Sequence, residues 1–244
     1  MKRTIFLLFL CTAVERDLGE HIFVPTTMPW LKAQTYCIQH YTDLSFVSSQ
    51  SDVDKLLTAA GAKSTIGWIG LHRDYSNITG WKWSGGGYIT YKNWAYGQPD
   101  NYNKNETYGH ILHDGKWNDD KGTQLLPFYC INITVTGVKK SWEKALEHCR
   151  ERNTDLTSLL SETESILAQK EIHKAGITER VWIGLRYLED HWLWVNGDLL
   201  EYEAWPKGGD QDHQCPIRNR CGALTKEGLW ENWECGDKLN FICH

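Results

Sequence analysis

The segment Trp68-Ile69-Gly70-Leu71 occurs a second time as Trp182-Ile183-Gly184-Leu185, and this repetition decides the fold. Residues around the two copies recur in the same order and at similar spacing. The recurring residues are Trp30 and Trp142, Cys37 and Cys149, Trp81 and Trp192, Trp83 and Trp194, Trp94 and Trp205, Trp117 and Trp230, and Cys130 and Cys243. Because one copy spans roughly 110 residues, the chain contains a duplicated domain rather than a stack of short repeats.

Each copy begins with helical patterns and continues with strands and loops. Trp, Ala and Cys fall at helical spacing in residues 30–41 and 142–152. A second helix is expected to open at the capping boxes of residues 49–52 and 161–164. The Gly-rich and Asn-rich remainder predicts short antiparallel strands, so each copy is an α+β domain. Residues 131–135 predict the first strand of the second copy, and the absence of a Pro/Gly/Ser linker predicts a stiff tandem.

The N-terminal residues 1–14 are predicted to be a signal peptide. Lys2 and Arg3 precede an apolar run, and small residues follow it, which is the order typical of secretory signals. The alternative is a buried N-terminal strand. The run is too short to cross a bilayer, and no later stretch of ~20 apolar residues occurs, so we expect no membrane span. We therefore expect a secreted, extracellular protein.

Charge and acceptor sequences add to this expectation. The net charge of −5 and the pI near 6.1 argue against a nucleic-acid partner, which would require a basic face. Three Asn-x-Thr triplets predict N-glycosylation at Asn77, Asn105 and Asn132. A glycan on Asn105 would stand beside Glu106.

The repeat also sorts the cysteines into disulfides, which are common in exported proteins. The first and last cysteines of each copy pair most simply with each other, and Cys221 and Cys235 form a further pair within the second copy. In the first copy, Tyr108 and Gly122 stand where these two cysteines would be, as expected of a bridge lost as a unit. The predicted bridges are Cys37–Cys130, Cys149–Cys243 and Cys221–Cys235. Cys215 is left over, and it is either free or links two chains into a homo-oligomer.

The cysteine spacing, the Trp-Ile-Gly-Leu segments and the closing Trp117-Asn118-Asp119 segment together resemble the C-type lectin-like domain family. The resemblance covers about residues 21–244. It implies two tandem domains, residues 21–131 and 132–244. Each would have two helices, small antiparallel sheets and a long loop region that carries calcium and ligand.

The resemblance implies a calcium site in the first domain. The family pattern is a Glu/Gln-Pro-Asn/Asp triplet, then a Glu, and then Asn-Asp after a Trp. The matching residues of this chain are Gln98, Asp100, Glu106, Asn118 and Asp119. Calcium prefers six to eight oxygen ligands, which amides and carboxylates supply, and sugar hydroxyls can fill the remaining positions. Pro99 follows a cis peptide bond in the family. The alternative interpretation is a polar surface loop.

The second domain departs from this pattern. Its residues at the corresponding positions are Gly209, Asp210, Gln211, Asn219, Glu231 and Asn232. We therefore expect it to lack the calcium site and to have a structural or protein-binding role. An auxiliary calcium site near Asp74 would lack an identifiable set of ligands.

The triplet Gln98-Pro99-Asp100 implies galactose-type rather than mannose-type or fucose-type ligands within this family. Galactose-type sites stack an aromatic ring on the sugar, and Tyr102 is placed for that role. The carbohydrate-binding residues are expected to be Gln98, Asp100, Tyr102, Glu106 and Asn118. The paired tryptophans are interpreted as core, because they recur in the copy without the site.

An enzyme is not expected, because the sequence has no nucleophile elbow, His-Glu-x-x-His motif or phosphate-binding loop. The expected function is calcium-dependent glycan binding. The alternative is a binding module for a non-sugar partner, such as a protein or ice, since one fold supports many functions.

Overall fold

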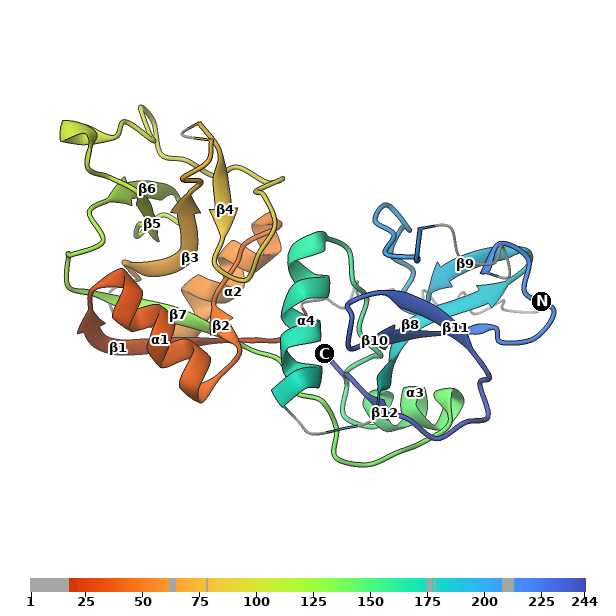
Figure 1. Cartoon of the computed structure of the whole chain (residues 1–244). Helices are drawn as coiled ribbons and strands as arrows, with labels where there is room; N and C mark the ends of the chain where they lie inside the picture. Colours follow the sequence, from red (N-terminus) through yellow and green to blue (C-terminus); the bar gives the residue numbers. More distant parts are fainter. Residues whose placement is uncertain (1–17, 62–64, 78, 175–176, 178, 208–212) are drawn as a thin grey trace, which may run out of the picture.

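The computed structural model describes residues 18–61, 65–77, 79–174, 177, 179–207 and 213–244. The predicted signal peptide lies outside these residues. The described chain forms two domains that lie side by side, with helix α4 between them (Figure 1).

Both domains have the α+β composition that the sequence predicts. The helices are α1 (Trp30–His40), α2 (Gln50–Ala60), η1 (Tyr102–Lys104), α3 (Trp142–Arg150) and α4 (Glu162–Lys174). The strands of the first sheet are β1 (Glu20–Met28), β2 (Asp43–Leu44), β3 (Gly67–Arg73), β4 (Trp81–Trp83), β5 (Tyr108–Ile111), β6 (Trp117–Asp120) and β7 (Leu126–Asn132). The strands of the second sheet are β8 (Arg180–Leu188), β9 (His191–Trp194), β10 (Cys221–Thr225), β11 (Trp230–Trp233) and β12 (Asn240–Phe241).

The two sheets share a topology that reflects the repeat. The first has the order β1-β7-β3-β5-β6, with β2 on β7 and β4 on β3, and the second has the order β11-β10-β8-β12, with β9 on β8. Most pairs are antiparallel, as predicted, but β3–β7 and β8–β12 are parallel. In each domain the last strand thus returns beside the strand that contains Trp-Ile-Gly-Leu.

Side-chain caps start the second helix of each domain where the sequence predicts them. Ser49 Oγ accepts the N–H of Asp52 at 3.2 Å, and Asp52 Oδ2 accepts the N–H of Ser49 at 2.9 Å. In the second domain, Ser161 Oγ accepts the N–H of Glu164 at 3.3 Å.

Nine of the twelve paired tryptophans are buried in the core, as predicted, and the other three, Trp94, Trp192 and Trp205, are half-buried and pack against it. Trp68 and Trp182 are both fully buried. Trp30 Nε1 donates to the carbonyl of Ile69 at 2.9 Å, and Trp142 Nε1 donates to the carbonyl of Ile183 at the same distance. Burying the large ring while pairing its one donor stabilises the same position in both copies.

All three predicted disulfides are present. They are Cys37–Cys130, Cys149–Cys243 and Cys221–Cys235. Cys215 is exposed and carries a free thiol, so its role in linking two chains stays a prediction.

The prediction that residues 131–135 form the first strand of the second domain is wrong. Ile131 and Asn132 belong to β7 of the first sheet, where they pair with β1. The second domain begins with isolated bridges, between Val135 and Ile242 and between Lys140 and Leu239.

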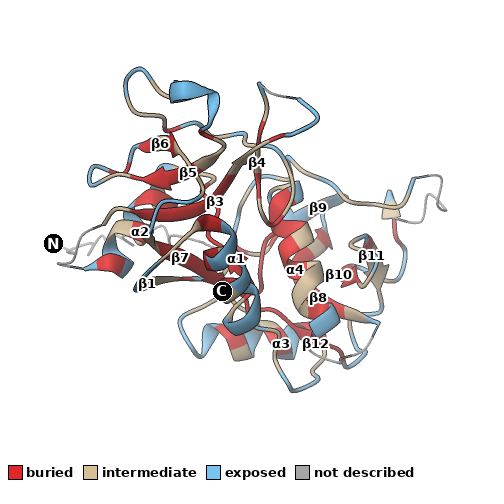
Figure 2. Ribbon diagram, turned by 60° about the vertical axis from the view of Figure 1, so that its left-hand side comes forward, coloured by how far each residue is buried: buried red, intermediate tan, exposed pale blue. Residues whose placement is uncertain are grey.

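Helix α4 of the second domain packs against the first domain. Figure 2 shows that this helix is largely buried or half-buried, whereas α1 has an exposed outer face. Lys170 Nζ lies 3.0 Å from Oδ2 of the fully buried Asp43, and Lys174 Nζ donates to the carbonyl of Tyr41 at 2.8 Å. Apolar residues of both domains belong to one buried cluster. These contacts agree with the expected stiff tandem.

Candidate functional site

Residues 98–107 form a loop at the outer end of the first domain, on the side away from α4 (Figure 1). The loop includes η1, and the peptide bond between Gln98 and Pro99 is cis, as the family resemblance implied. Strand β6 contributes Asn118 and Asp119. Two segments separated in sequence therefore supply the predicted calcium ligands.

Three of these ligands converge. One carboxylate oxygen from each of Asp100, Glu106 and Asp119 lies within 4.8 Å of the other two. Asp119 is fully buried and Glu106 is 9% exposed, whereas Asp100 is exposed to solvent. The cluster is therefore closed at Asp119 and open at Asp100. A group of hard oxygen donors of this kind fits a calcium ion.

Backbone amides of the loop hold the carboxylates in place. Asp119 Oδ1 accepts the N–H of Asp100 and Asp119 Oδ2 accepts the N–H of Asn101, both at 3.1 Å. Glu106 Oε2 accepts the N–H of Tyr102 at 2.8 Å. Because ionised acceptors form the stronger hydrogen bonds, these contacts fix the loop against β6.

Arg73, at the end of β3, lies on the buried side of the cluster. Its Nη2 lies 3.1 Å from Asp119 Oδ2. Its guanidinium also lies over the Trp81 ring, 4.7 Å from the ring centroid. The buried carboxylate therefore has a positive partner within the protein.

Burial raises the pKa of both Glu106 and Asp119. The N–H of Tyr102 opposes this shift at Glu106, while the charges of Asp119 and Asp100 reinforce it. At Asp119, the N–H groups of Asn101 and Asp100 and the charge of Arg73 oppose it. Both carboxyl groups therefore bind a proton more readily than exposed ones do.

The other predicted site residues lie around this cluster. Gln98 Oε1 accepts the N–H of Asp100 at 3.1 Å, and Asn118 Nδ2 donates to the carbonyl of Asp119 at 2.6 Å. Tyr102 is 64% exposed, so its ring is open to solvent next to the carboxylates.

Two further residues of the site, Asn101 and Arg73, were not predicted from the sequence. Asn101 has a positive φ of 50°, and its Oδ1 accepts the N–H of Glu106 at 3.1 Å. An Asn directly after the triplet could have indicated this, because Asn tolerates left-handed backbone. Arg73 offers no local indication, since its contact with β6 depends on how the strands pair.

The second domain has a different arrangement at the corresponding positions. Glu231, which stands in the place of Asn118, lies 2.9 Å from Nε of Arg180. The guanidinium of Arg180 stacks on Trp233, 3.9 Å from the ring centroid. Residues 209–211, where the triplet is missing, lie outside the described residues. That this domain lacks the calcium site stays a prediction.

The predicted glycosylation residues differ in exposure. Asn77 and Asn105 are exposed, whereas Asn132 is half-buried on β7. Asn105 lies directly beside the ligand Glu106 in the chain.

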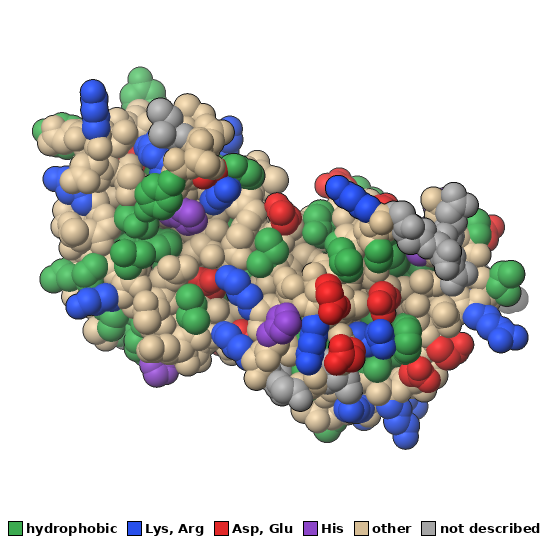
Figure 3. All heavy atoms as spheres, in the orientation of Figure 1, with side chains coloured by type: hydrophobic (Ala, Val, Ile, Leu, Met, Phe, Trp, Pro, Cys, Tyr) green, Lys and Arg blue, Asp and Glu red, His purple; other side chains and the backbone are tan. Residues whose placement is uncertain are grey.

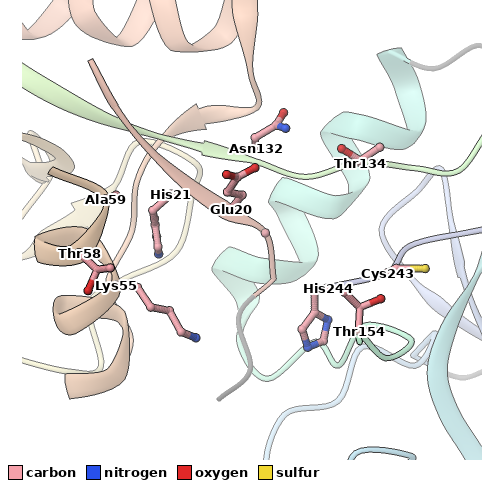
Figure 4. Close-up of a pocket in the computed structure, with 11 residues that line it drawn as sticks. Glu20, His21, Lys55, Thr58, Ala59, Asn132, Thr134, Thr154, Cys243 and His244 are labelled. Atoms are coloured by element: carbon pink, nitrogen blue, oxygen red, sulfur yellow. The ribbon is translucent and has the colours of Figure 1, made fainter. Parts of the chain in front are cut away.

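A cavity of about 650 Å³ lies at the junction of the domains. Figure 4 shows His21 of β1 and Lys55 of α2 on one side and His244 on the other. None of the predicted calcium ligands lines this cavity, so it is separate from the loop. On the face drawn in Figure 3, acidic and basic side chains are interspersed over the second domain.

Comparison with known families identifies both halves of the chain. The model of the lectin C-type domain matches residues 26–132 and again residues 138–244. The chain belongs to the C-type lectin domain family. This is a family of binding proteins rather than enzymes, in agreement with the sequence analysis.

Relatives of this C-type lectin domain protein include a lymphocyte antigen and two receptors. Human lymphocyte antigen 75 is 24% identical over 89% of this chain, and human C-type mannose receptor 2 is 21% identical over 92%. The bovine secretory phospholipase A2 receptor is 24% identical over 96% of the chain. The chain spans only 14%, 18% and 19% of the length of these three relatives.

Similar solved structures each cover about one domain. The carbohydrate-recognition domain of the mouse scavenger receptor C-type lectin is 27% identical, with a TM-score of 0.42, and the match covers 45% of this chain and 86% of that one. The C-type lectin CEL-I from Cucumaria echinata is 30% identical, with a TM-score of 0.42, and the match covers 48% of this chain and 93% of that one. Within the described part of the chain, no helix combines the length and hydropathy needed to cross a membrane.

Proposed function

We propose that the first domain binds carbohydrate in a calcium-dependent manner through the loop of residues 98–107 and strand β6. The observation that carries this proposal is the convergence of three carboxylates within 4.8 Å of one another. One of them is open to solvent, where a ligand can approach.

The donor set fits calcium in kind and charge. Asp100, Glu106 and Asp119 supply carboxylates, and Gln98 and Asn118 supply amide oxygens. When bound, the ion would offer free coordination positions to two sugar hydroxyls, and the protein side chains would hydrogen-bond the same hydroxyls. The exposed ring of Tyr102 provides an apolar face next to them.

We propose galactose-type ligands in preference to mannose-type or fucose-type ligands. Gln98 carries an amide and Asp100 a carboxylate, and this order fixes which sugar hydroxyl donates and which accepts. Exchanging the two groups in the double variant Gln98→Glu/Asp100→Asn should therefore shift the preference toward mannose. Retention of the galactose preference in that variant would contradict this assignment.

The decisive experiment measures retention of the protein on immobilised galactose, mannose and fucose, first with calcium and then with a chelator. Calcium-dependent retention on galactose supports the whole proposal, and retention on mannose or fucose alone contradicts only the specificity. If calcium binds but no sugar retains the protein, a protein-binding or ice-binding module replaces the lectin.

A matched pair of variants locates the site. Asp100→Ala removes the exposed carboxylate of the cluster and should abolish retention. Asp54→Ala removes another exposed carboxylate of the first domain, on α2, and should leave retention unchanged. Sugar binding that survives Asp100→Ala would place the site elsewhere.

We further propose that the protein is exported and glycosylated. The three disulfides support an oxidising compartment. A glycosidase shift on electrophoresis, with Asn77→Gln, Asn105→Gln and Asn132→Gln compared singly, would show which sites carry glycans.

A further inference from the structure

We propose that Arg73 is a positioning residue that holds the loop of residues 98–107 in its ligand-ready shape before any cation binds. The inference rests on the proposed calcium site, although its test needs no sugar. It concerns a residue outside the set of predicted ligands.

The contacts of Arg73 link three parts of the first domain. Besides its ion pair with Asp119 on β6, its Nε donates to the carbonyl of Glu106 in the loop at 3.4 Å. Its guanidinium lies over Trp81 of β4. The side chain is only 15% exposed, so solvent screens these contacts weakly.

Asp119 connects Arg73 to the loop. Its carboxylate is fully buried, and besides Arg73 it accepts the N–H groups of Asp100 and Asn101. A buried carboxylate without a positive partner is strongly unfavourable. Arg73 supplies that partner to Asp119, and the same carboxylate accepts the two loop amides in charge-assisted hydrogen bonds, so Arg73 helps to fix where the loop lies.

The charge balance of the site points the same way. The three carboxylates carry −3 and Arg73 carries +1, so −3 + 1 = −2 remains. One divalent cation neutralises that remainder. Arg73 therefore compensates the third negative charge, and we expect this to help the loop keep its shape while the divalent ion is absent.

The second domain supplies a matched control. Arg180 pairs with Glu231 and stacks on Trp233 much as Arg73 pairs with Asp119 and stacks on Trp81. Arg180→Met removes the corresponding, more exposed ion pair from the same protein without touching the loop of the first domain.

Hydrogen exchange of the amides of Asp100, Asn101 and Tyr102 tests the inference, measured in the full chain with a chelator and with calcium. In the wild type, we expect protection of these amides already in chelator. In Arg73→Met, we expect these amides to exchange at least about tenfold faster in chelator and to regain their protection at saturating calcium. Arg73→Lys should keep part of the protection in chelator. Arg180→Met should behave like the wild type.

A spectroscopic readout separates positioning from a general loss of structure. Terbium carries one more positive charge than calcium, so removal of the Arg73 charge should favour terbium several-fold over calcium in a luminescence competition. Arg73→Lys keeps the charge and should leave the ratio unchanged.

Free exchange of the three wild-type amides in chelator would overturn the proposal, and this measurement stands even if Arg73→Met fails to fold. Wild-type protection that persists in Arg73→Met would overturn it as well. Absence of sugar binding with the expected exchange pattern would refute the proposed function and leave this inference intact.

Discussion

Gly122 and Tyr108 occupy in the first domain the positions that Cys235 and Cys221 occupy in the second. A Cβ atom built on Gly122 would lie 2.5 Å from the Tyr108 ring. The carbonyl of Gly122 accepts the N–H of Trp30 at 2.9 Å, and the carbonyl of Cys235 accepts the N–H of Trp142 at 3.0 Å. The backbone is thus maintained in both domains, and an aromatic ring packs where the other domain has a covalent bond.

Gly122→Ala should destabilise the first domain, because the added methyl group meets the Tyr108 ring. We expect a cost of about 1–3 kcal/mol, as for other overpacked sites. Chemical denaturation of the variant measures it. Gly236→Ala, where no atom lies within 4 Å of the added Cβ, is the control and should change stability little.

The double variant Tyr108→Cys/Gly122→Cys should form a disulfide and stabilise the first domain. Because the loop would match the 14-residue separation of Cys221 and Cys235, the gain should be about 3 kcal/mol. Thermal melting with and without reductant measures the effect. A variant whose two new thiols stay free would show that the strands are spaced differently here.

Protons should compete with calcium at a higher pH than in a site of ordinary carboxylates. Burial raises the pKa of Glu106 and Asp119, so both begin to protonate above the usual range near pH ~4. The apparent calcium affinity should therefore fall as the pH is lowered from neutral, well before pH ~4 is reached. Calcium titrations at several pH values test this, and a constant affinity down to pH ~4 would contradict the carboxylate cluster.

At the scale of single elements, β5 connects the binding loop to the core. His110 on this strand is only 6% exposed and meets Trp68 edge-on, with ring centroids 5.7 Å apart. Burial lowers the pKa of His110, and the charge of Asp120 only partly opposes this shift. Protonation of His110 is therefore disfavoured in the folded protein.

Acidification should destabilise the first domain through His110. Since its folded pKa lies below the unfolded value near ~6.5, the unfolded chain binds more protons as the pH falls through that value, and stability declines. His110→Phe should flatten the dependence of unfolding free energy on pH between about 7 and 5. His113→Gln, at an exposed residue, should not.

The elements that the sequence predicts well are those governed by local chemistry. Helix α2 begins at its capping box, and residues of the Trp-Ile-Gly-Leu segment lie on β3. The strand over residues 131–135 was assigned to the wrong domain, because only the pairing with β1 decides where an apolar run belongs. The ligand residues were predictable from a motif, whereas Arg73 was not, because its role depends on how β3 and β6 lie relative to each other.

At the scale of the whole molecule, the two domains share an interface built on α4. Thr163 Oγ1 donates to the carbonyl of Gly86 at 2.8 Å, and a Cβ atom on Gly86 would lie 2.7 Å from Ile166. Asp43 has its cationic partner Lys170 in the other domain, whereas the equivalent Asp155 pairs with Arg150 of its own domain. The first domain therefore depends on the second for part of its electrostatic balance.

Lys170→Met should destabilise the first domain, because it leaves the buried Asp43 without its cation. We expect a loss of about 1–3 kcal/mol, as for other buried polar groups deprived of a partner. Scanning calorimetry should show unfolding at a lower temperature than in the wild type, with a less cooperative transition. Lys144→Met, which removes an exposed pair with Glu147 on α3, is the control. Equal melting of the two variants would show that the Lys170–Asp43 pair contributes no stability.

The packing of α4 on residues 84–87 has a genetic consequence. Those residues follow β4 and precede the segment that ends in the binding loop. A substitution in α4 that changes its contact with them should therefore shift that segment and the loop. A random mutagenesis screen for lost sugar binding should therefore recover substitutions in α4, many positions downstream of the ligands. Suppressors of such alleles should map back to residues 84–87, in the other half of the duplicated sequence.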